Sequence, residues 1–186
     1  VESAIAKSTS ESYNFGIIFL DLDGFKLVND LDGHEAGDLL LVECASRLKS
    51  STRKGDGLAR MGGDEFALLI HDLTSREDVE QAAVRIEEGL SAPFKIGTRT
   101  LTVSASIGIV LSSEIPVSAP AEVRSNLLKS ADMAMYTAKK AGSGRRQHFD
   151  QKLSEDHSRN LQLEFALRSA EHNNEMLLHY QPIIDL

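Results

Sequence analysis

The chain has 186 residues, of which 20 are Lys or Arg and 28 are Asp or Glu, so its formal net charge is −8. This length suffices for one full domain with a sizeable core and part of another. The acidic balance argues against a protein that grips a nucleic-acid polymer or an anionic membrane through its overall field, and it leaves metal ions and mononucleotides as the expected partners.

We expect neither a membrane-spanning segment nor a disulfide bond within this chain. No apolar stretch approaches the ~20 residues that a membrane span requires, and the first residues lack the pattern of a signal peptide. We therefore expect a cytoplasmic chain without membrane contact in this segment. The only cysteine, Cys44, excludes a disulfide within the chain. It continues a helical pattern with Leu41, Ala45 and Leu48, which predicts a packed, inert thiol.

The apolar pattern alternates between strands and helices along the chain. Residues 2–11 are expected to end a helix, and the continuous apolar run 15–20 predicts a fully buried strand. The next expected elements are a helix at about 35–51, a hairpin around 62–63, a helix through 79–90, strands near 94–96 and 101–111, and a helix through 127–138. This order predicts an α/β sandwich with helices on the faces of a sheet.

The segment RMGGDEF at 60–66 predicts a hairpin whose tip carries two acids. Gly62 and Gly63 supply the positive φ angles that a tight two-residue turn requires, between strands at 58–59 and 66–70. By itself such a tip is ordinary turn chemistry that binds nothing. Upstream, however, the apolar run 15–20 ends in the acidic stretch DLD at 21–23, and two acidic strand ends can form one site.

With these motifs the chain resembles the GGDEF domains, which are diguanylate cyclases and their degenerate relatives. The shared elements follow the family's order and approximate spacing: DLDGFK at 21–26, ND at 29–30, GH at 33–34, GD at 37–38, R at 60, GGDEF at 62–66, AD at 131–132 and YTAK at 136–139. The resemblance covers roughly residues 1–149. It implies a ferredoxin-like core with a mainly antiparallel sheet, similar to the palm of nucleotide cyclases and polymerases.

Both ends of the chain carry expectations of their own. The family usually begins with an element D-x-L-T-G-L-x-N-R that is absent here, so we expect the chain to start inside the first helix. Residues 150–186 resemble the linker helix and first strand of an EAL domain, the cyclic di-GMP phosphodiesterase module, which implies a longer GGDEF-EAL protein. A native strand at 176–186 that docks on the first domain is the alternative.

The resemblance implies condensation of two GTP molecules into cyclic di-GMP with release of pyrophosphate. Asp21, the backbone carbonyl of Leu22 and Asp64 match the family's ligands for Mg²⁺ (or Mn²⁺), hard ions that prefer oxygen donors. Asp64 and Glu65 match the catalytic acids, and the family's general base is usually placed at the position of Asp64. The alternative for Asp21 is a helix N-cap before Phe25.

The same resemblance assigns residues to the substrate. Asn29 and Asp38 match the residues that read guanine, whose N1 and N2 donors suit a carboxylate acceptor. From their residue types alone, Asn29 would be a turn residue and Asp38 a solvated helix residue. His34 is a further candidate, with a capping or surface role as its alternative. Lys26 matches a position that holds the terminal phosphates.

Lys139 matches the second phosphate-holding position, and beyond it the chain departs from the family. The family commonly has Arg directly after the glycine that corresponds to Gly142, but Ser143 stands there and Arg145 follows two residues later. We expect either that Arg145 substitutes for it or that phosphate affinity is weaker. No GxxxxGK[ST] loop is present, so binding of the P-loop type is excluded.

An inhibitory product site is implied at Arg53 and Asp56, which lie where the family's RxxD motif falls. Arg binds phosphate or guanine, and Asp accepts from a guanine edge. The alternative is an ordinary solvated surface, because four-residue Arg/Asp patterns are common on charged chains.

Three functions remain in contention. The first is an active cyclase that works as a homodimer in which each domain brings one GTP. The second is a non-catalytic GTP-binding domain that regulates its own attached EAL phosphodiesterase. The third is a dimerisation spacer, which would bind no nucleotide.

Overall fold

The computed structural model describes residues 14–116 and 119–170, together with the single positions 173, 175, 177 and 179. Contacts within the chain divide it into two units, residues 1–150 and 151–186. The sheet and its helices belong to the first unit. The second unit contains helix α6 (Gln151–Ala170), which matches the polar helix expected after residue 150.

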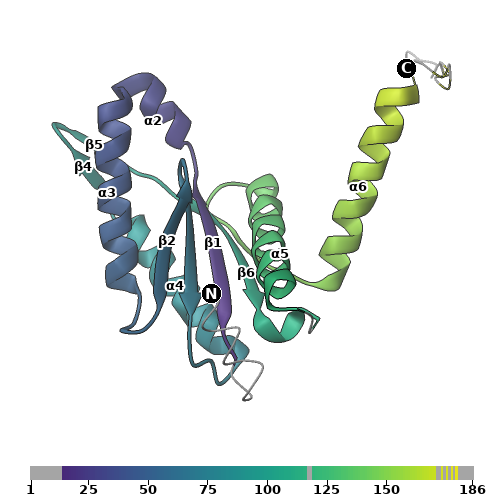
Figure 1. The fold of residues 1–186 in the computed structure, drawn as a ribbon. Coiled ribbons are helices and arrows are strands. Elements are labelled where there is room, and N and C mark those ends of the chain that lie inside the picture. Colours follow the sequence, from purple (N-terminus) through teal and green to yellow (C-terminus); the bar gives the residue numbers. More distant parts are fainter. Residues whose placement is uncertain are drawn as a thin grey trace, which may run out of the picture. The chain divides into compact units, whose positions relative to one another are not determined.

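Five strands form one sheet in the order β2-β3-β1-β6-β7 (Figure 1). Their bounds are Gly16–Leu22 for β1, Gly57–Gly62 for β2, Glu65–Ile70 for β3, Ala105–Leu111 for β6 and Arg146–His148 for β7. Neighbouring strands are antiparallel except β6 and β7, which are parallel. Strands β4 (Phe94–Ile96) and β5 (Arg99–Leu101) form a separate hairpin. The predicted mainly antiparallel, ferredoxin-like sheet is confirmed.

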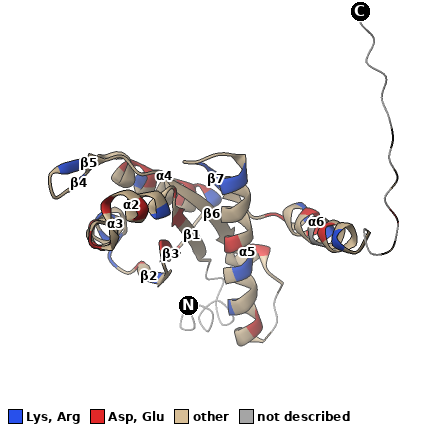
Figure 2. Ribbon diagram, turned by 90° about the horizontal axis from the view of Figure 1, so that it is seen from above, with Lys and Arg blue, Asp and Glu red and all other residues tan. Residues whose placement is uncertain are grey.

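Helices cover both faces of this sheet. They are α2 (Phe25–Asp32), α3 (His34–Ser51), α4 (Arg76–Ser91) and α5 (Pro120–Ala141), with a 3₁₀ turn at Ser112–Glu114. Figure 2 shows α3 and α4 on one side of the sheet and α5 on the other. The helices predicted at 35–51, 79–90 and 127–138 are confirmed as α3, α4 and α5.

Strand β1 is buried along its whole length, as its continuous apolar run predicts. Because successive side chains of a strand point to opposite faces, β1 serves two layers. Ile18, Leu20 and Leu22 belong to the core that includes residues of α3 and α4. Phe19 and Asp21 therefore face the α5 side. This alternation brings one carboxylate to the covered face at the end of the central strand.

Two strand predictions need correction. Of the two glycines in the predicted turn, only Gly63 has a positive φ, of 49°. Gly62 instead ends β2, next to an irregularity in the β2–β3 ladder. The run 101–111 is not one strand, because β5 ends at Leu101 and β6 begins at Ala105. In the gap, the carbonyl of Ser104 accepts a hydrogen bond from the N–H of Asp23 at 2.9 Å, which continues the β1–β6 pairing by one residue beyond Leu22 and Ala105.

Two elements were not predicted. Helix α2 has only eight residues, fewer than the window in which a helical period is recognised, and its apolar residues Phe25 and Val28 are only partly buried against the core. Strand β7 has only three residues and is too short for a periodic signal. The helix expected at 2–11 and the strand expected at 176–186 lie outside the described residues, apart from isolated positions in the latter.

Candidate functional site

The end of β1 lies beside the turn that joins β2 and β3. Asp21 pairs with Glu65 across the antiparallel ladder. The N–H of Leu22 donates to the backbone carbonyl of Asp64 at 3.4 Å. The structure thus brings together the four predicted metal and catalytic positions, which lie far apart in the sequence.

The turn itself is held by its own residues. Gly63 adopts the left-handed conformation that side-chain-bearing residues rarely accept. The Nε of Arg60 donates to the carbonyl of Gly63 at 2.9 Å. This bond fixes the backbone directly before Asp64, so the acidic tip has a defined position relative to β1.

The carboxylates at this site share one electrostatic field. Burial raises the pKa of Asp21, and the charge of Asp64 adds to the rise, while a hydrogen bond from Lys139 opposes it. Burial also raises the pKa of Glu65, followed by the charges of Asp132, Asp21 and Asp64. Excess negative charge therefore destabilises the fully ionised site, and a cation placed among these groups would relieve it.

Lys139 supplies one such cation from the last turn of α5. Its Nζ donates to Oδ1 of Asp21 at 2.6 Å, and the Asp21 side chain is only 9% exposed. The hydrogen bond to Asp21 raises the pKa of Lys139, so the ammonium is stabilised. The position predicted to hold a metal ligand is thus one where a positive charge already lies.

The donor set fits a hard divalent cation. Among residues 14–116 and 119–170, no group of three His, Cys, Asp or Glu side chains could hold a metal by itself. The predicted site needs only two such side chains, the carboxylates of Asp21 and Asp64, together with the backbone carbonyl of Leu22. Mg²⁺ commonly takes one or two carboxylates and completes its shell with water and substrate phosphates, so these oxygens fit its needs.

The predicted guanine readers lie at the junction of α2 and α3. Asn29 is on α2, and its side chain crosses Gly37 of α3, since a Cβ added to Gly37 would lie 1.9 Å from Asn29 Oδ1. The same Cβ would lie 3.2 Å from Cζ of Phe25. Asp38, the next residue, is exposed. The absence of a side chain at position 37 therefore lets Asn29 lie close to the helix that carries Asp38.

The predicted phosphate and substrate groups other than Lys139 are more dispersed. Lys26 and His34 are exposed near the starts of α2 and α3. Arg145 lies in the loop between α5 and β7, where its carbonyl accepts from the N–H of Ile107 at 2.9 Å. A Cβ added to Gly142 would lie 3.4 Å from Nε of Arg145, so this guanidinium folds back over the loop.

The residues of the expected product site lie at the far end of the β2–β3 hairpin. Asp56 directly precedes β2, so the length of that strand separates it from the turn by ~17 Å. One oxygen of Asp56 accepts from the N–H of Arg53 at 2.8 Å, and the other accepts from the N–H of His71 at 3.2 Å. Asp56 thus holds its own turn to the end of β3, while Arg53 is exposed.

Sequence reasoning gave no role to Asp23, although it belongs to the shared DLDGFK element. Both of its carboxylate oxygens accept hydrogen bonds, from Ser104, Ser106 and Gly144. The signal in the sequence is weak, because two serines at the start of a strand are common. Asp132 was likewise unassigned, and its charge acts on Glu65.

Two other expectations concern the rest of the chain. Cys44 is fully buried, and burial raises the pKa of its thiol to about 12, so the prediction of an inert thiol is confirmed. No described helix combines the length and the apolar character needed to cross a bilayer.

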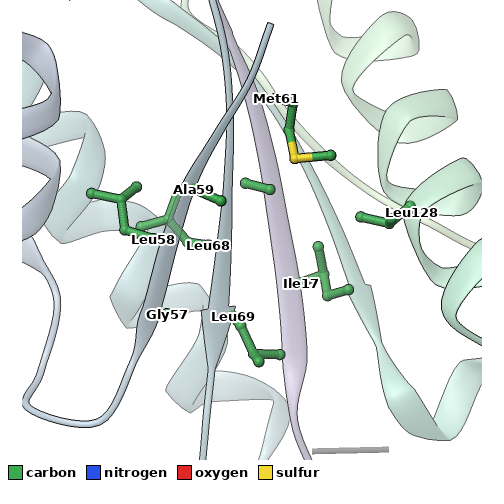
Figure 3. A pocket seen from close by; sticks show the side chains of 9 residues that line it. Ile17, Gly57, Leu58, Ala59, Met61, Leu68, Leu69 and Leu128 are labelled. Atoms are coloured by element: carbon green, nitrogen blue, oxygen red, sulfur yellow. The ribbon is translucent and has the colours of Figure 1, made fainter. Parts of the chain in front are cut away.

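An apolar pocket lies on the α5 side of β2 and β3 (Figure 3). Ile17 of β1 and Leu128 of α5 face each other across it, and Met61 lies above them in the view. The remaining lining residues are Gly57, Leu58, Ala59, Ala67, Leu68 and Leu69. This lining lacks charged groups, so the pocket is no candidate for a triphosphate.

The sequence of this chain is similar to those of known proteins. Residues 1–145 match the model of the family described as "Diguanylate cyclase, GGDEF domain". The chain is 39% identical over 184 residues to the bifunctional diguanylate cyclase/cyclic di-GMP phosphodiesterase MucR of Pseudomonas aeruginosa, covering 98% of this chain and 26% of MucR. It is 38% identical over 175 residues to the cyclic di-GMP phosphodiesterase PdeR of Escherichia coli, covering 94% of this chain and 26% of PdeR.

The fold also matches solved structures. The crystal structure of the GGDEF domain of TpbB (YfiN) from Pseudomonas aeruginosa superposes with a TM-score of 0.74 at 37% identity, covering 80% of this chain and 90% of that one. The chain spans only about a quarter of the length of the curated relatives named above.

Proposed function

Because this chain belongs to the GGDEF domain family of diguanylate cyclases, we propose that it condenses GTP into cyclic di-GMP. In each half of the reaction, the 3′ hydroxyl of one GTP attacks the α-phosphate of the other and pyrophosphate leaves. Two GTP molecules thus give one cyclic di-GMP and two pyrophosphates.

The convergence of carboxylates at the end of β1 carries this proposal. Asp21 and Glu65 are paired across the ladder, and burial, followed by neighbouring negative charge, raises the pKa of each. A purely structural hairpin tip gains nothing from such mutual repulsion. The arrangement does make sense where a divalent cation and a triphosphate are to be received.

Each predicted residue then has a task. Asp21, Asp64 and the Leu22 carbonyl would hold Mg²⁺ (or Mn²⁺), which when bound would stabilise charge on the phosphates and make the attacking hydroxyl more acidic. Asp64 and Glu65 are the proposed acceptors of the hydroxyl proton.

The substrate groups complete the assignment. Asn29 and Asp38 would read the guanine edge, with His34 nearby on the start of α3. Lys26, Lys139 and Arg145 would neutralise the terminal phosphates. The second GTP would come from a second copy of the domain, so synthesis should rise more steeply than protein concentration until the dimer is formed.

A product assay with a charge-neutral variant tests the proposal. The protein and its Asp64→Asn variant are incubated with GTP and Mg²⁺ at several protein concentrations, and cyclic di-GMP is measured. Asp72→Asn is the matched control, because Asp72 is exposed beyond β3 and its φ of 53° is one that Asn also tolerates. Equal synthesis by Asp64→Asn and the unmodified protein would refute the assignment.

A second candidate is a regulatory domain that binds GTP without converting it and controls an attached EAL phosphodiesterase. The similarity to PdeR, which is named a phosphodiesterase, and the presence of Ser143 in place of Arg favour it. In the whole protein, this candidate predicts no GTP-derived cyclic di-GMP and a hydrolysis rate that changes when GTP is added. A chain that binds no GTP in calorimetry would instead be a spacer.

Product inhibition at Arg53 and Asp56 is a further part of the proposal. Since both oxygens of Asp56 already accept backbone N–H groups, the exposed guanidinium of Arg53 would provide most of the attraction for a cyclic dinucleotide. Synthesis assayed with added cyclic di-GMP tests this, and equal inhibition of an Arg53→Ala variant would exclude it.

A further inference from the structure

Asp23 lies at a junction of three chain segments. Its Oδ1 accepts from the hydroxyl of Ser106 at 2.7 Å. Its Oδ2 accepts from the hydroxyl of Ser104 at 2.6 Å and from the backbone N–H of Gly144 at 2.7 Å. One carboxylate therefore connects the end of β1, the start of β6 and the loop that follows α5.

The bonds of Asp23, which directly follows β1, distinguish it from Asp21 within that strand. Asp21 accepts from the ammonium at the end of the long Lys139 side chain, whereas both oxygens of Asp23 accept from two serine hydroxyls and a backbone N–H. Asp23 is therefore already satisfied as an acceptor and needs no ion from outside. Charge-assisted hydrogen bonds of this length are among the stronger ones in proteins, so the junction is held firmly.

The loop that Asp23 holds runs from the end of α5 to the start of β7. Gly144 is bound by the carboxylate, and the carbonyl of the following residue, Arg145, is bound by the N–H of Ile107 on β6. Lys139 lies just before the loop, in the last turn of α5. Two of the three cations proposed to face the phosphates, Lys139 and Arg145, thus lie on either side of the residue that Asp23 fixes.

We propose that Asp23 is a positioning residue, which sets the place of loop 142–145 and thereby the spacing of Lys139 and Arg145 for a nucleoside triphosphate. The part of this inference that concerns the spacing of cations for a triphosphate rests on the proposed function. The chemistry also explains why a carboxylate is suited here. It accepts from three donors at once, whereas an alanine would leave the N–H of Gly144 without its side-chain acceptor.

Variants of the full chain separate the anchor from general packing. Asp23→Ala removes all three bonds. Asp23→Asn keeps an oxygen for Gly144 and Ser104, and its amide can donate to the Ser106 hydroxyl once that hydroxyl rotates, so it is the conservative rescue. Ser106→Ala is the matched control, because it removes one bond to Asp23 and leaves the one to Gly144 intact.

Two readouts test the inference. Hydrogen exchange of the Gly144 amide, followed without nucleotide, should be at least about tenfold faster in Asp23→Ala and near the unmodified rate in Asp23→Asn and Ser106→Ala. Calorimetry with a non-hydrolysable GTP analogue and Mg²⁺ should show about tenfold weaker binding for Asp23→Ala alone. If Asp23→Ala does not fold, Ser104→Ala takes its place, because Ser104 donates to Oδ2, the oxygen that Gly144 uses, whereas Ser106 donates to Oδ1. Without the serine bond Oδ2 is held less firmly, so we expect about threefold faster exchange at Gly144.

Unchanged exchange at Gly144 in the folded Asp23→Ala variant would overturn the anchor. Faster exchange combined with unaltered affinity for the analogue would overturn the positioning role. If the unmodified chain binds no analogue, the proposed function fails together with the phosphate role of Asp23, while the exchange measurement still decides separately whether Asp23 holds the loop.

Discussion

Substitution of Gly37 by alanine gives a sharp test of how the α2–α3 junction prepares a guanine site. The added Cβ would lie 1.9 Å from Oδ1 and 3.0 Å from Cγ of Asn29. Because a Cβ normally keeps at least about 3.2 Å from such an oxygen, the amide must move by roughly 1.3 Å. Misplacement of a binding group by about 1 Å can lower activity about 100-fold.

Folding should suffer much less than binding. Alanine is favoured over glycine in a helix interior by about 1 kcal/mol, which offsets part of the cost of moving one partly exposed side chain. We therefore expect Gly37→Ala to melt within a few degrees of the unmodified chain. Its affinity for a GTP analogue should fall by about 10- to 100-fold, and its preference for GTP over ATP should shrink because Asn29 no longer reaches the base.

Calorimetry with both nucleotides and thermal unfolding measure these effects. Gly89→Ala is the matched control, because it also places a Cβ in a helix against a side-chain oxygen, that of Ser51 at 2.5 Å, but on α4. In an Asn29→Ala background, Gly37→Ala should have little further effect on binding. A Gly37→Ala variant that keeps full affinity and selectivity, or that costs as much without Asn29 as with it, would refute the reasoning.

The remaining predictions concern charge. Asp64→Asn should lower cyclic di-GMP synthesis at least about 100-fold, because it removes a metal ligand. It should not lower the melting temperature, because it also removes one of several like charges. A lower melting temperature alongside the loss of synthesis would contradict this. The raised pKa values of Asp21 and Glu65 mean that the folded chain holds protons that the unfolded chain has lost. Without metal, the contribution of these two groups to stability should therefore grow as pH falls through their raised pKa values, and it should be smallest at neutral pH and above. Urea unfolding at several pH values checks the sign, and Glu65→Gln should flatten the dependence. Over the same range Mn²⁺ should bind more weakly as pH falls, since protons compete for the carboxylates. Finally, Arg53→Ala should relieve inhibition by cyclic di-GMP and leave the stability of the fold unchanged. Asp56→Ala should instead lower the free energy of unfolding by about 1–3 kcal/mol, because two backbone N–H groups lose their acceptor. Inhibition curves and unfolding curves for the two variants distinguish these effects.

The sequence predicted those parts of the fold that have a strong local signal. The apolar run that became β1, the glycine turn at Gly63 and the stripe from Val79 to Leu90 each specify an element through neighbours in the chain. Helix α2 escaped prediction because its eight residues are fewer than the window in which a helical period is recognised. The break between β5 and β6 reflects their different partners, since β5 pairs with β4 in a separate hairpin whereas β6 pairs with β1 in the main sheet.

The candidate site shows the same division. Asp21, Asp64 and Glu65 could be named because the family resemblance fixes their positions, and the strand register explains how they meet. The contact of Asn29 with Gly37 depends on the angle between two helices, and the partners of Asp23 come from segments about 80 and 120 residues away. No local pattern encodes such distances, so these features emerged only from the three-dimensional arrangement.

The ion pair between Lys139 and Asp21 has a consequence for the order of binding. An ammonium held against one aspartate cannot at the same moment reach a phosphate, so a metal ion that takes over that aspartate sets the lysine tail free for the nucleotide. Binding of the metal ion therefore favours binding of the nucleotide, and binding of the nucleotide favours that of the metal ion. Magnesium and triphosphate should accordingly enter as a cooperative pair, each binding more tightly once its companion is in place, and titrating one in the presence and absence of the other would measure that synergy.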